Sequence, residues 1–378
     1  MIPTTKDRKY QICTRCVMDT TDPDISFDEE GVCSHCKFRD NREKHFVFIG
    51  EEREQRLEKL VSEIKSAGRG KRYDCIIGVS GGIDSTFVAY IVKKVGLRPL
   101  AVHLDNGWDS ELAVKNIEET LKRLQLDLYT HVIDWSEFKD IQLSFLRAST
   151  PDLEIPSDHA IVSLMRKMAI KVGVQYIISG VNIRTESHLP TAWSQGHLDW
   201  RYIKNVHKTF GSGKIETFPH MNLMTVIAYS ARQKWVDILN YLDYNKETAK
   251  RTITQELCWK DYGWKHFESI YTRFYQGYIL PQKFGFDKRK THFSSLICSG
   301  EMTRAEALQM LNEEPYPRQM QEDDRAYVIK KFGLRTNEFE AIMNLPAKSY
   351  WDYPSYRRFY SSRFFELAKY IYRRYLRY

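Results

Sequence analysis

Four cysteines near the start of the chain have the spacing of a metal site. Cys13 and Cys16 form one C-x2-C pair, and Cys33 and Cys36 form a second pair after sixteen further residues. Two residues between paired cysteines allow a tight turn to direct both thiolates at one ion, which is typical of tetrahedral structural zinc sites. Four thiolates leave no open position for catalysis. We therefore predict a structural Zn²⁺ on these four side chains, with His35 as an alternative ligand and disulfides as the competing interpretation.

A glycine-rich segment further along has the character of a phosphate-binding loop. The string SGGIDST occupies residues 80–86, directly after an apolar run and before a helical pattern. Paired glycines at a strand-to-helix turn allow backbone N–H groups to approach an anion at the helix N-terminus. The segment has neither the Walker lysine nor the G-x-G-x-x-G pattern of dinucleotide-binding proteins. An ordinary turn is the alternative to phosphate binding.

The predicted elements divide the chain into four segments. Residues 1–50 form the cysteine module, 51–68 a linker helix, 69–220 a region of alternating strands and helices, and 221–378 a mainly helical region. Strands are expected over 74–79, 99–104, 128–133 and 175–179, with helices over 85–95, 109–124 and 157–172. Strands separated by helices predict an α/β fold with a doubly wound parallel sheet.

Composition restricts the class of protein. The 378 residues carry a net charge of +8, which favours an anionic partner such as a nucleotide. No apolar run approaches the length of about 18 residues needed for a membrane span. The start of the chain lacks the apolar core of a signal peptide. We expect a cytoplasmic protein with reduced cysteines.

The SGGIDST string resembles the loop of the PP-loop ATP pyrophosphatases. This resemblance implies cleavage of ATP between its α and β phosphates, giving AMP and pyrophosphate. The implied nucleotide-binding residues are Ser80, Gly81, Gly82, Asp84, Ser85, Thr86, Asp105, Gly180 and Asn182. Asp84, Ser85 and Glu186 are the expected catalytic residues. Asp84 and Glu186 are also the expected ligands of Mg²⁺, which typically takes one or two carboxylates besides phosphate oxygens; a solvated loop carboxylate is the alternative role for Glu186.

Further segments make the whole chain similar to the N-acetyl sugar amidotransferases of surface-polysaccharide biosynthesis, the WbpG/PseA-like family. They are TPDLEIPSDHAI at 150–161, SGVNIRTES at 179–187, KDYGWKH at 260–266 and the block at 274–308. The resemblance implies ATP-dependent conversion of an acetamido group of a nucleotide-linked sugar into an acetamidino group. The implied partner is a separate glutaminase, like the glutaminase and cyclase subunits of histidine biosynthesis, which supplies ammonia.

The candidate substrate-binding residues lie in those segments and in the basic run after residue 282. They are Asp158, His159, Lys260, Lys265, His266, Lys288 and Arg289. The basic residues suit the diphosphate of a nucleotide sugar, with a solvated charge run as the alternative. Asp158 and His159 lie near a predicted helix start, where capping is the alternative role.

Two further interpretations compete with the amidotransferase. Some PP-loop tRNA thiolation enzymes also have N-terminal cysteine pairs, although nucleic acid is not the partner we expect here. A non-enzymatic zinc-bearing adaptor would require that ATP is neither bound nor cleaved. The basic and aromatic segment 353–378 is expected to dock on protein, with peripheral contact to an anionic membrane as its alternative.

Overall fold

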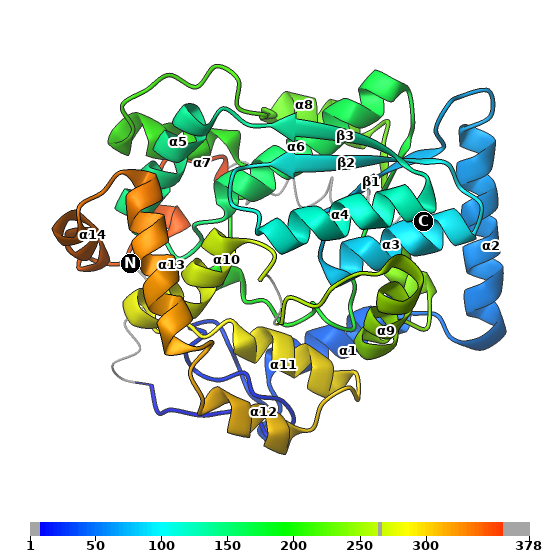
Figure 1. Cartoon of the computed structure of the whole chain (residues 1–378). Helices are drawn as coiled ribbons and strands as arrows, with labels where there is room; N and C mark the ends of the chain where they lie inside the picture. The colour runs from blue at the N-terminus through cyan, green and yellow to red at the C-terminus, as the bar shows by residue number, and fades with distance from the viewer. Residues whose placement is uncertain (1–7, 264–266, 358–378) are drawn as a thin grey trace.

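A five-stranded parallel sheet lies at the centre of the computed structural model, which describes residues 8–263 and 267–357 (Figure 1). Its strands are β1 (Cys75–Gly78), β2 (Pro99–Asp105), β3 (Asp127–Val132), β4 (Tyr176–Ser179) and β5 (Lys234–Asp237). The spatial order is β3-β2-β1-β4-β5, and every neighbouring pair is parallel. The predicted α/β fold with a doubly wound parallel sheet is confirmed.

Helices cover both faces of this sheet. Successive side chains of each strand point to opposite faces, so the apolar residues of one strand are buried on both sides. Cys75 and Ile77 of β1 belong to a core with α2 (Gly50–Ala67), α3 (Ile83–Lys94), α4 (Glu111–Leu124) and α9 (Lys246–Leu257). Ile76 belongs to the opposite core, with α5 (Trp135–Ala148), α6 (Ile155–Val172) and α7 (Trp200–Phe210). Residues buried on both faces explain the continuous apolar run of β1.

The strand order places a topological switch point between β1 and β4. From β1 the chain proceeds to β2 and β3 on one side, whereas β4 and β5 lie on the other. Cys75 is the register partner of both Pro99 and Tyr176, so β1 has a parallel neighbour on each side. In open parallel sheets the crevice beyond the carboxyl ends of the strands at a switch point is the usual ligand site. The loops after Gly78 and Ser179 border that crevice.

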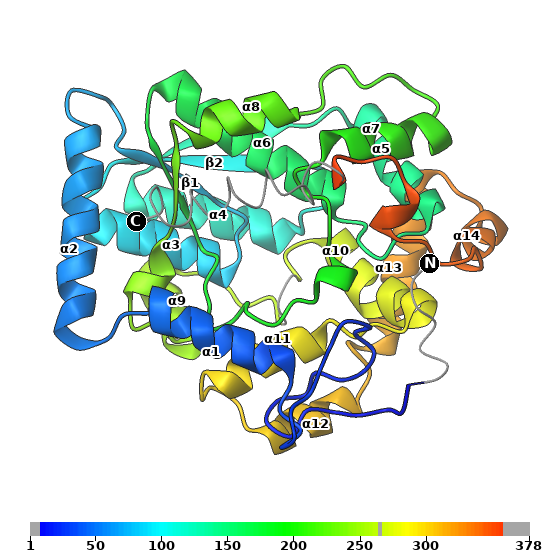
Figure 2. The ribbon, with the colours of Figure 1, turned by 180° about the vertical axis from the view of Figure 1, so that it is seen from behind.

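The cysteine segment packs against helices from the C-terminal part of the chain. Figure 2 shows α1 (Ser34–Phe46) beside α11 (Arg289–Cys298), with the preceding loop near α12 (Arg304–Leu311). Arg304 donates hydrogen bonds to the carbonyl oxygens of Cys13, at 3.0 Å, and of Cys16, also at 3.0 Å. Lys290 forms an ion pair with the buried Asp19. The segment is therefore held by helices that lie more than 250 residues away in sequence.

The remaining helices complete the C-terminal part and the loops. They are α8 (Leu223–Ser230), α10 (Ile270–Phe274), the π-helix η4 (Tyr275–Phe284), α13 (Arg318–Phe332) and α14 (Thr336–Met343), with short 3-10 turns at Thr191–Trp193, Ile238–Tyr241 and Tyr350–Asp352. Among the described residues, no helix is long and apolar enough to cross a membrane.

Two predicted boundaries need correction. The sheet does not end at residue 220, because β5 and the covering helix α9 follow it. β5 has a weak apolar pattern: only Val236 is buried, and Lys234 and Trp235 are exposed at the sheet edge. The helix expected to be a linker, α2, buries Leu60, Val61 and Ile64 in the core of the sheet domain. It is therefore part of that domain.

Candidate active site

The glycine-rich loop runs from the end of β1 into the first turn of α3, at the switch point. Gly81 has φ +77°, a conformation that favours glycine. A Cβ atom at this position would lie 2.5 Å from the carbonyl oxygen of Ala113 on α4. The carbonyl oxygen of Gly81 accepts a hydrogen bond from the Trp259 indole at 2.8 Å. The positive φ and the close approach to Ala113 require glycine here, and the hydrogen bond from Trp259 fixes the loop against the segment after α9.

Two hydroxyl groups of the loop are held together at its centre. The Oγ atoms of Ser80 and Ser85 are 3.1 Å apart, and Ser85 also donates to the carbonyl oxygen of Gly82 at 3.2 Å. Both serines are half-buried, whereas Thr86 is only 2% exposed in the first turn of α3. The structure thus brings the predicted serines to the accessible part of the loop, and places Thr86 beneath it.

Asp84 lies in the first turn of α3, in a group of acidic and phenolic side chains. The Tyr244 hydroxyl donates a hydrogen bond to its carboxylate. Burial, followed by the charges of Asp84, Glu186 and Glu301, raises the pKa of Tyr244 far above its usual range. The Asp84 charge also contributes, after burial, to the raised pKa of Glu301. The predicted Mg²⁺ ligands Asp84 and Glu186 therefore lie in one electrostatic neighbourhood, with Glu301 as an acid that the sequence did not reveal.

The other predicted nucleotide-binding residues lie at the carboxyl ends of the neighbouring strands β2 and β4. Gly180 packs against Asp84, since a Cβ atom there would be 3.2 Å from the Asp84 side chain. Asp105 ends β2 and accepts a hydrogen bond from the Gly107 backbone at 2.9 Å. Asn182 is 2% exposed, and its side chain bonds to Gly180 and Thr185 within its own loop. Asn182 shapes the loop after β4, because its polar atoms are committed there.

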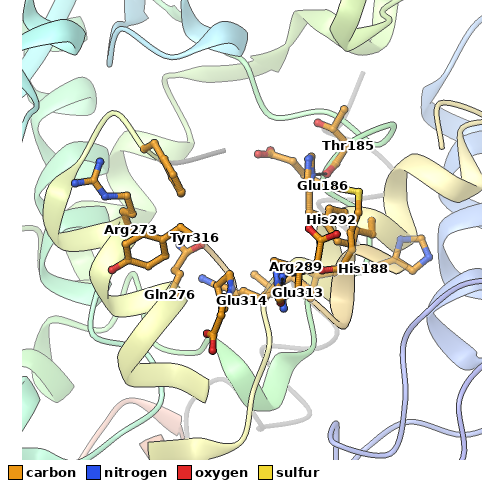
Figure 3. A pocket seen from close by; sticks show the side chains of 18 of the residues that line it. Thr185, Glu186, His188, Arg273, Gln276, Arg289, His292, Glu313, Glu314 and Tyr316 are labelled. Carbon is orange, nitrogen blue, oxygen red and sulfur yellow. Dashed lines mark hydrogen bonds between the residues drawn. The ribbon is translucent and has the colours of Figure 1, made fainter. Parts of the chain in front are cut away.

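A cavity of about 800 Å³ opens beside this group. Figure 3 shows Arg273, Gln276 and Tyr316 on one side of the cavity and Thr185, Glu186 and His292 across from them. Asp158, Lys288 and Arg289 also line it. The volume is within the range of about 300–1,000 Å³ that is usual for small-molecule sites. Glu186 belongs both to this cavity and to the group around Asp84, so the two form one candidate active site.

The predicted substrate-binding residues separate into three groups. Asp158 and Lys288 line the cavity. Arg289 also lines it, but its guanidinium group pairs with Asp287 at 2.8 Å and donates to the carbonyl oxygens of Met310 and Glu313. The Lys260 side chain is exposed and is not among the residues that line the cavity. Lys265 and His266 lie outside the described residues.

The structure contradicts the predicted substrate contact of His159. Its ring is fully buried, and its Nε2 accepts a hydrogen bond from the Met221 backbone at 3.2 Å. Nδ1 therefore carries the proton and donates to the carbonyl oxygen of His197 at 2.7 Å. Burial lowers the pKa of His159 to about 4. Because both ring nitrogens are committed within the core, His159 positions the loop that carries His197.

His197 belongs to an ionic group that the sequence pattern did not indicate. Its Nε2 lies 3.2 Å from Asp152 and 3.3 Å from Asp158, the cavity residue. Although burial opposes it, the hydrogen bond to Asp152 raises the pKa of His197 to about 9. Nearby, burial and the charge of Asp158 raise the pKa of Glu154 to about 8. The sequence places Asp152 and Asp158 in the segment TPDLEIPSDHAI. His197 lies some 40 residues further along and belongs to none of the motifs.

The four predicted zinc ligands come together in the structure. All four cysteines are fully buried, and their Sγ atoms lie within 4.8 Å of one another. The Sγ atoms of Cys16 and Cys33 are 3.6 Å apart, and those of Cys13 and Cys36 are 4.0 Å apart. Four sulfurs at 2.3 Å around a tetrahedral zinc would be about 3.8 Å apart. The donor set fits Zn²⁺, whereas His35 points elsewhere and pairs with Asp22 at 2.6 Å.

The fold and loop define the nucleotide-binding domain of the PP-loop ATP pyrophosphatase class. Residues 268–369 match the family described as LPS biosynthesis protein WbpG-like, C-terminal domain. The resemblance stated from the sequence is thereby confirmed for the C-terminal part.

Curated relatives come from several members of the PP-loop class. The chain is 26% identical over 171 residues to the tRNA-5-methyluridine(54) 2-sulfurtransferase of Thermotoga maritima, covering 41% of this chain and 53% of that protein. It is 25% identical over 169 residues to the NH(3)-dependent NAD(+) synthetase of Carboxydothermus hydrogenoformans, covering 41% and 66%. The chain thus spans about half the length of the first curated relatives it matches. The solved NMN synthetase of Francisella tularensis aligns over 78% of this chain and 98% of its own, at 16% identity and a TM-score of 0.32, which is too low to carry the fold.

Proposed function

We propose that this chain is an ATP-dependent amidotransferase that converts the acetamido group of a nucleotide-linked N-acetyl sugar into an acetamidino group in surface-polysaccharide biosynthesis. The observation that carries the proposal is that two different parts of the chain line the cavity together. The segment matching the WbpG-like domain supplies Arg273, Gln276 and Lys288 to a cavity that also contains Glu186, from the nucleotide-binding domain. A sugar bound there would meet ATP at the switch point.

The proposed reaction has two balanced steps. The amide oxygen of the sugar forms a bond to the α phosphorus of ATP, and the bond from that phosphorus to pyrophosphate breaks. Ammonia then adds to the imidate carbon, AMP leaves with the former amide oxygen, and a proton is lost. Adenylation is needed because the oxygen of an amide is otherwise a very poor leaving group. The protein contributes positioning and charge stabilisation.

Each part of the site has a role in this scheme. The loop at the N-terminus of α3 would hold the pyrophosphate through its backbone N–H groups and the hydroxyls of Ser80 and Ser85. Asp84 and Glu186 would hold Mg²⁺, which when bound neutralises phosphate charge. Tyr244 orients the Asp84 carboxylate. Lys288 would face the diphosphate of the sugar nucleotide.

Ammonia is the proposed nitrogen source, delivered in the cell by a separate glutaminase. A glutaminase needs an activated cysteine nucleophile. Cys75 is fully buried in β1, and Cys258 is exposed at the C-terminal end of α9. The sulfur of Cys298 lies within 3.7 Å of the Cys36 sulfur, in the cysteine-rich group. We expect the isolated chain to use ammonium and not glutamine.

The test incubates the chain with ATP, magnesium, ammonium and a panel of nucleotide N-acetyl sugars. Mass spectrometry should find one sugar in which oxygen is replaced by NH, together with AMP and pyrophosphate. Replacing ammonium by glutamine should abolish the product. ADP as the nucleotide product would contradict the PP-loop chemistry, and product formed from glutamine alone would contradict the separate glutaminase.

A tRNA-modifying activity of the thiolation type is the second candidate, and the similarity to the Thermotoga maritima sulfurtransferase favours it. Such an enzyme would consume ATP in the presence of tRNA and leave the sugars unchanged. Parallel reactions with bulk tRNA and with the sugar panel, each monitored for AMP, separate the two candidates.

A further inference from the structure

A second group of side chains that could hold a metal ion adjoins the four-cysteine cluster. The Sγ atom of Cys298 is 3.7 Å from the Sγ atom of Cys36 and 3.7 Å from Nε2 of His188. The Cys36 Sγ atom is 3.8 Å from the same nitrogen. The three atoms form a nearly equilateral triangle. A tetrahedral zinc with bonds of 2.3 Å to sulfur and 2.0–2.1 Å to nitrogen would separate such donors by about 3.6–3.8 Å.

The hydrogen bonds around His188 leave its Nε2 with a free electron pair. The Ser295 hydroxyl donates its proton to the carbonyl oxygen of Thr291 at 2.9 Å. Nδ1 of His188 lies 3.1 Å from this oxygen and 3.0 Å from that of the Ser187 hydroxyl, which itself donates to Ser295 at 3.5 Å, so both oxygens can accept from Nδ1. With the proton on Nδ1, Nε2 is unprotonated and points at the two sulfurs. A metal-bound histidine typically has this second hydrogen bond, which fixes both its tautomer and its orientation.

The four-cysteine site cannot account for Cys298 and His188. A zinc held by Cys13, Cys16, Cys33 and Cys36 has all four positions filled. His188 is fully buried and comes from the loop after β4, whereas Cys298 ends α11. Two elements that are distant in sequence thus bring soft donors to a single thiolate, Cys36. Arg304 supplies a positive charge on the side of Cys13 and Cys16.

We propose that the chain binds a second zinc-like divalent ion through His188, Cys298 and Cys36, with the Cys36 thiolate shared between the two ions. Thiolate and imidazole ligands select borderline-soft ions such as Zn²⁺ over Mg²⁺. The three protein ligands leave a fourth position for water or another small ligand. His188 also lines the large cavity, so this ion lies between the cysteine cluster and the candidate active site.

The test counts metal in the full chain purified after growth with added zinc. Elemental analysis should find two zinc ions per chain in the wild type and one in Cys298→Ser and in His188→Asn. Cys258→Ser is the matched control, because that cysteine is exposed and outside the cluster, and it should retain two. One ion in the zinc-saturated wild type, or two ions retained in Cys298→Ser, would overturn the proposal.

A spectroscopic measurement keeps the test independent of folding defects and of catalysis. X-ray absorption at the zinc edge should show a zinc–zinc scattering path in the wild type, and this path should vanish in Cys298→Ser while zinc–sulfur scattering remains. Cys298→Ser changes one atom, and circular dichroism would verify that it is folded. Iron in place of zinc, with visible charge-transfer bands, would also contradict the proposal.

Discussion

In the proposed mechanism, Asp84 is the residue on which the nucleotide chemistry most depends. Its carboxylate accepts a hydrogen bond from Tyr244 and packs against Gly180, so its position is fixed before ligands bind. We expect Asp84→Asn to lower kcat by about 100-fold or more, the usual cost of losing one preorganised charge interaction. Discontinuous assays of AMP formation would measure the loss of kcat.

The matched control for this change is Asp323→Asn, at an exposed carboxylate on α13. It should leave both kcat and the free energy of unfolding unchanged. Full activity of Asp84→Asn would remove Asp84 from the catalytic group.

The buried carboxyl oxygen of Glu154 predicts a pH-dependent stability. Burial and the neighbouring Asp158 raise its pKa to about 8, and its Oε1 atom has no hydrogen-bond partner among the described residues. A carboxyl group with a raised pKa binds its proton more tightly in the folded state, so its contribution is complete below about pH 4.5 and is lost as pH rises through 8. The free energy of unfolding should therefore fall between pH 5 and pH 8.

Glu154→Gln should flatten this dependence, because glutamine mimics the protonated acid and keeps an acceptor for the Thr272 hydroxyl. Urea unfolding at several pH values would measure it, with the exposed Glu118→Gln as control. His197, whose raised pKa of about 9 acts in the same direction at higher pH, remains in both variants. Equal slopes for wild type and Glu154→Gln would show that Glu154 is ionised in the folded chain.

At the scale of elements, the phosphate loop depends on its close approach to α4. Gly81→Ala would place a Cβ atom 2.5 Å from the Ala113 carbonyl oxygen, in addition to the strain of a positive φ. We expect it to lose ATP turnover and to lower the free energy of unfolding by more than the strain alone, which is about 1–2 kcal/mol.

Gly173→Ala isolates the strain. Gly173 has φ +75°, but a Cβ atom there would meet nothing within 4 Å. Gly173→Ala should lower the free energy of unfolding only by the backbone strain and leave ATP turnover unchanged. Equal destabilisation by both substitutions, with equal activity, would mean that the loop tolerates displacement from α4.

The attachment of the cysteine segment to α12 is a second prediction at this scale. Arg304→Met keeps the apolar stem and removes the hydrogen bonds to the Cys13 and Cys16 carbonyls. Hydrogen bonds from charged groups contribute about 1.5–3 kcal/mol, so we expect a decrease of that size in the free energy of unfolding and faster zinc release to a chelator. Arg318→Met, at a side chain 87% exposed, should stay within about 0.5 kcal/mol. Identical chelation rates for wild type and Arg304→Met would contradict this role of α12.

At the scale of the whole molecule, the elements with a strong local apolar pattern were predicted correctly, and those defined by distant contacts were not. The apolar runs of β1, β2 and β4 and the amphipathic helices between them predicted the parallel sheet within a few residues at each end. β5 was missed because it presents only Val236 to the core. Local patterns also made α2 look like a linker, since its packing partners lie on distant strands.

The residues of the candidate site also divide into those that the sequence predicted and those that it did not. The loop at 80–86 and the four cysteines were predictable, because each depends on residue types at short spacing. Glu301, Tyr244 and His197 were not, because only the tertiary fold brings them to Asp84 and Asp158. His159 was wrong for a related reason: a histidine on a helix face gives no sign of whether its ring faces the core or a ligand.

The central claim is that the sugar's own amide oxygen is adenylated, and isotope transfer tests it most directly. The acetamido carbonyl of the accepted nucleotide sugar is labelled with ¹⁸O, and the full chain is supplied with ATP, magnesium and ammonium. Mass spectrometry of the AMP phosphate and of the sugar then follows the label. The account predicts one ¹⁸O atom in each AMP formed and an acetamidino sugar without the label. Unlabelled AMP, with ¹⁸O retained in the sugar or released to water, would contradict it.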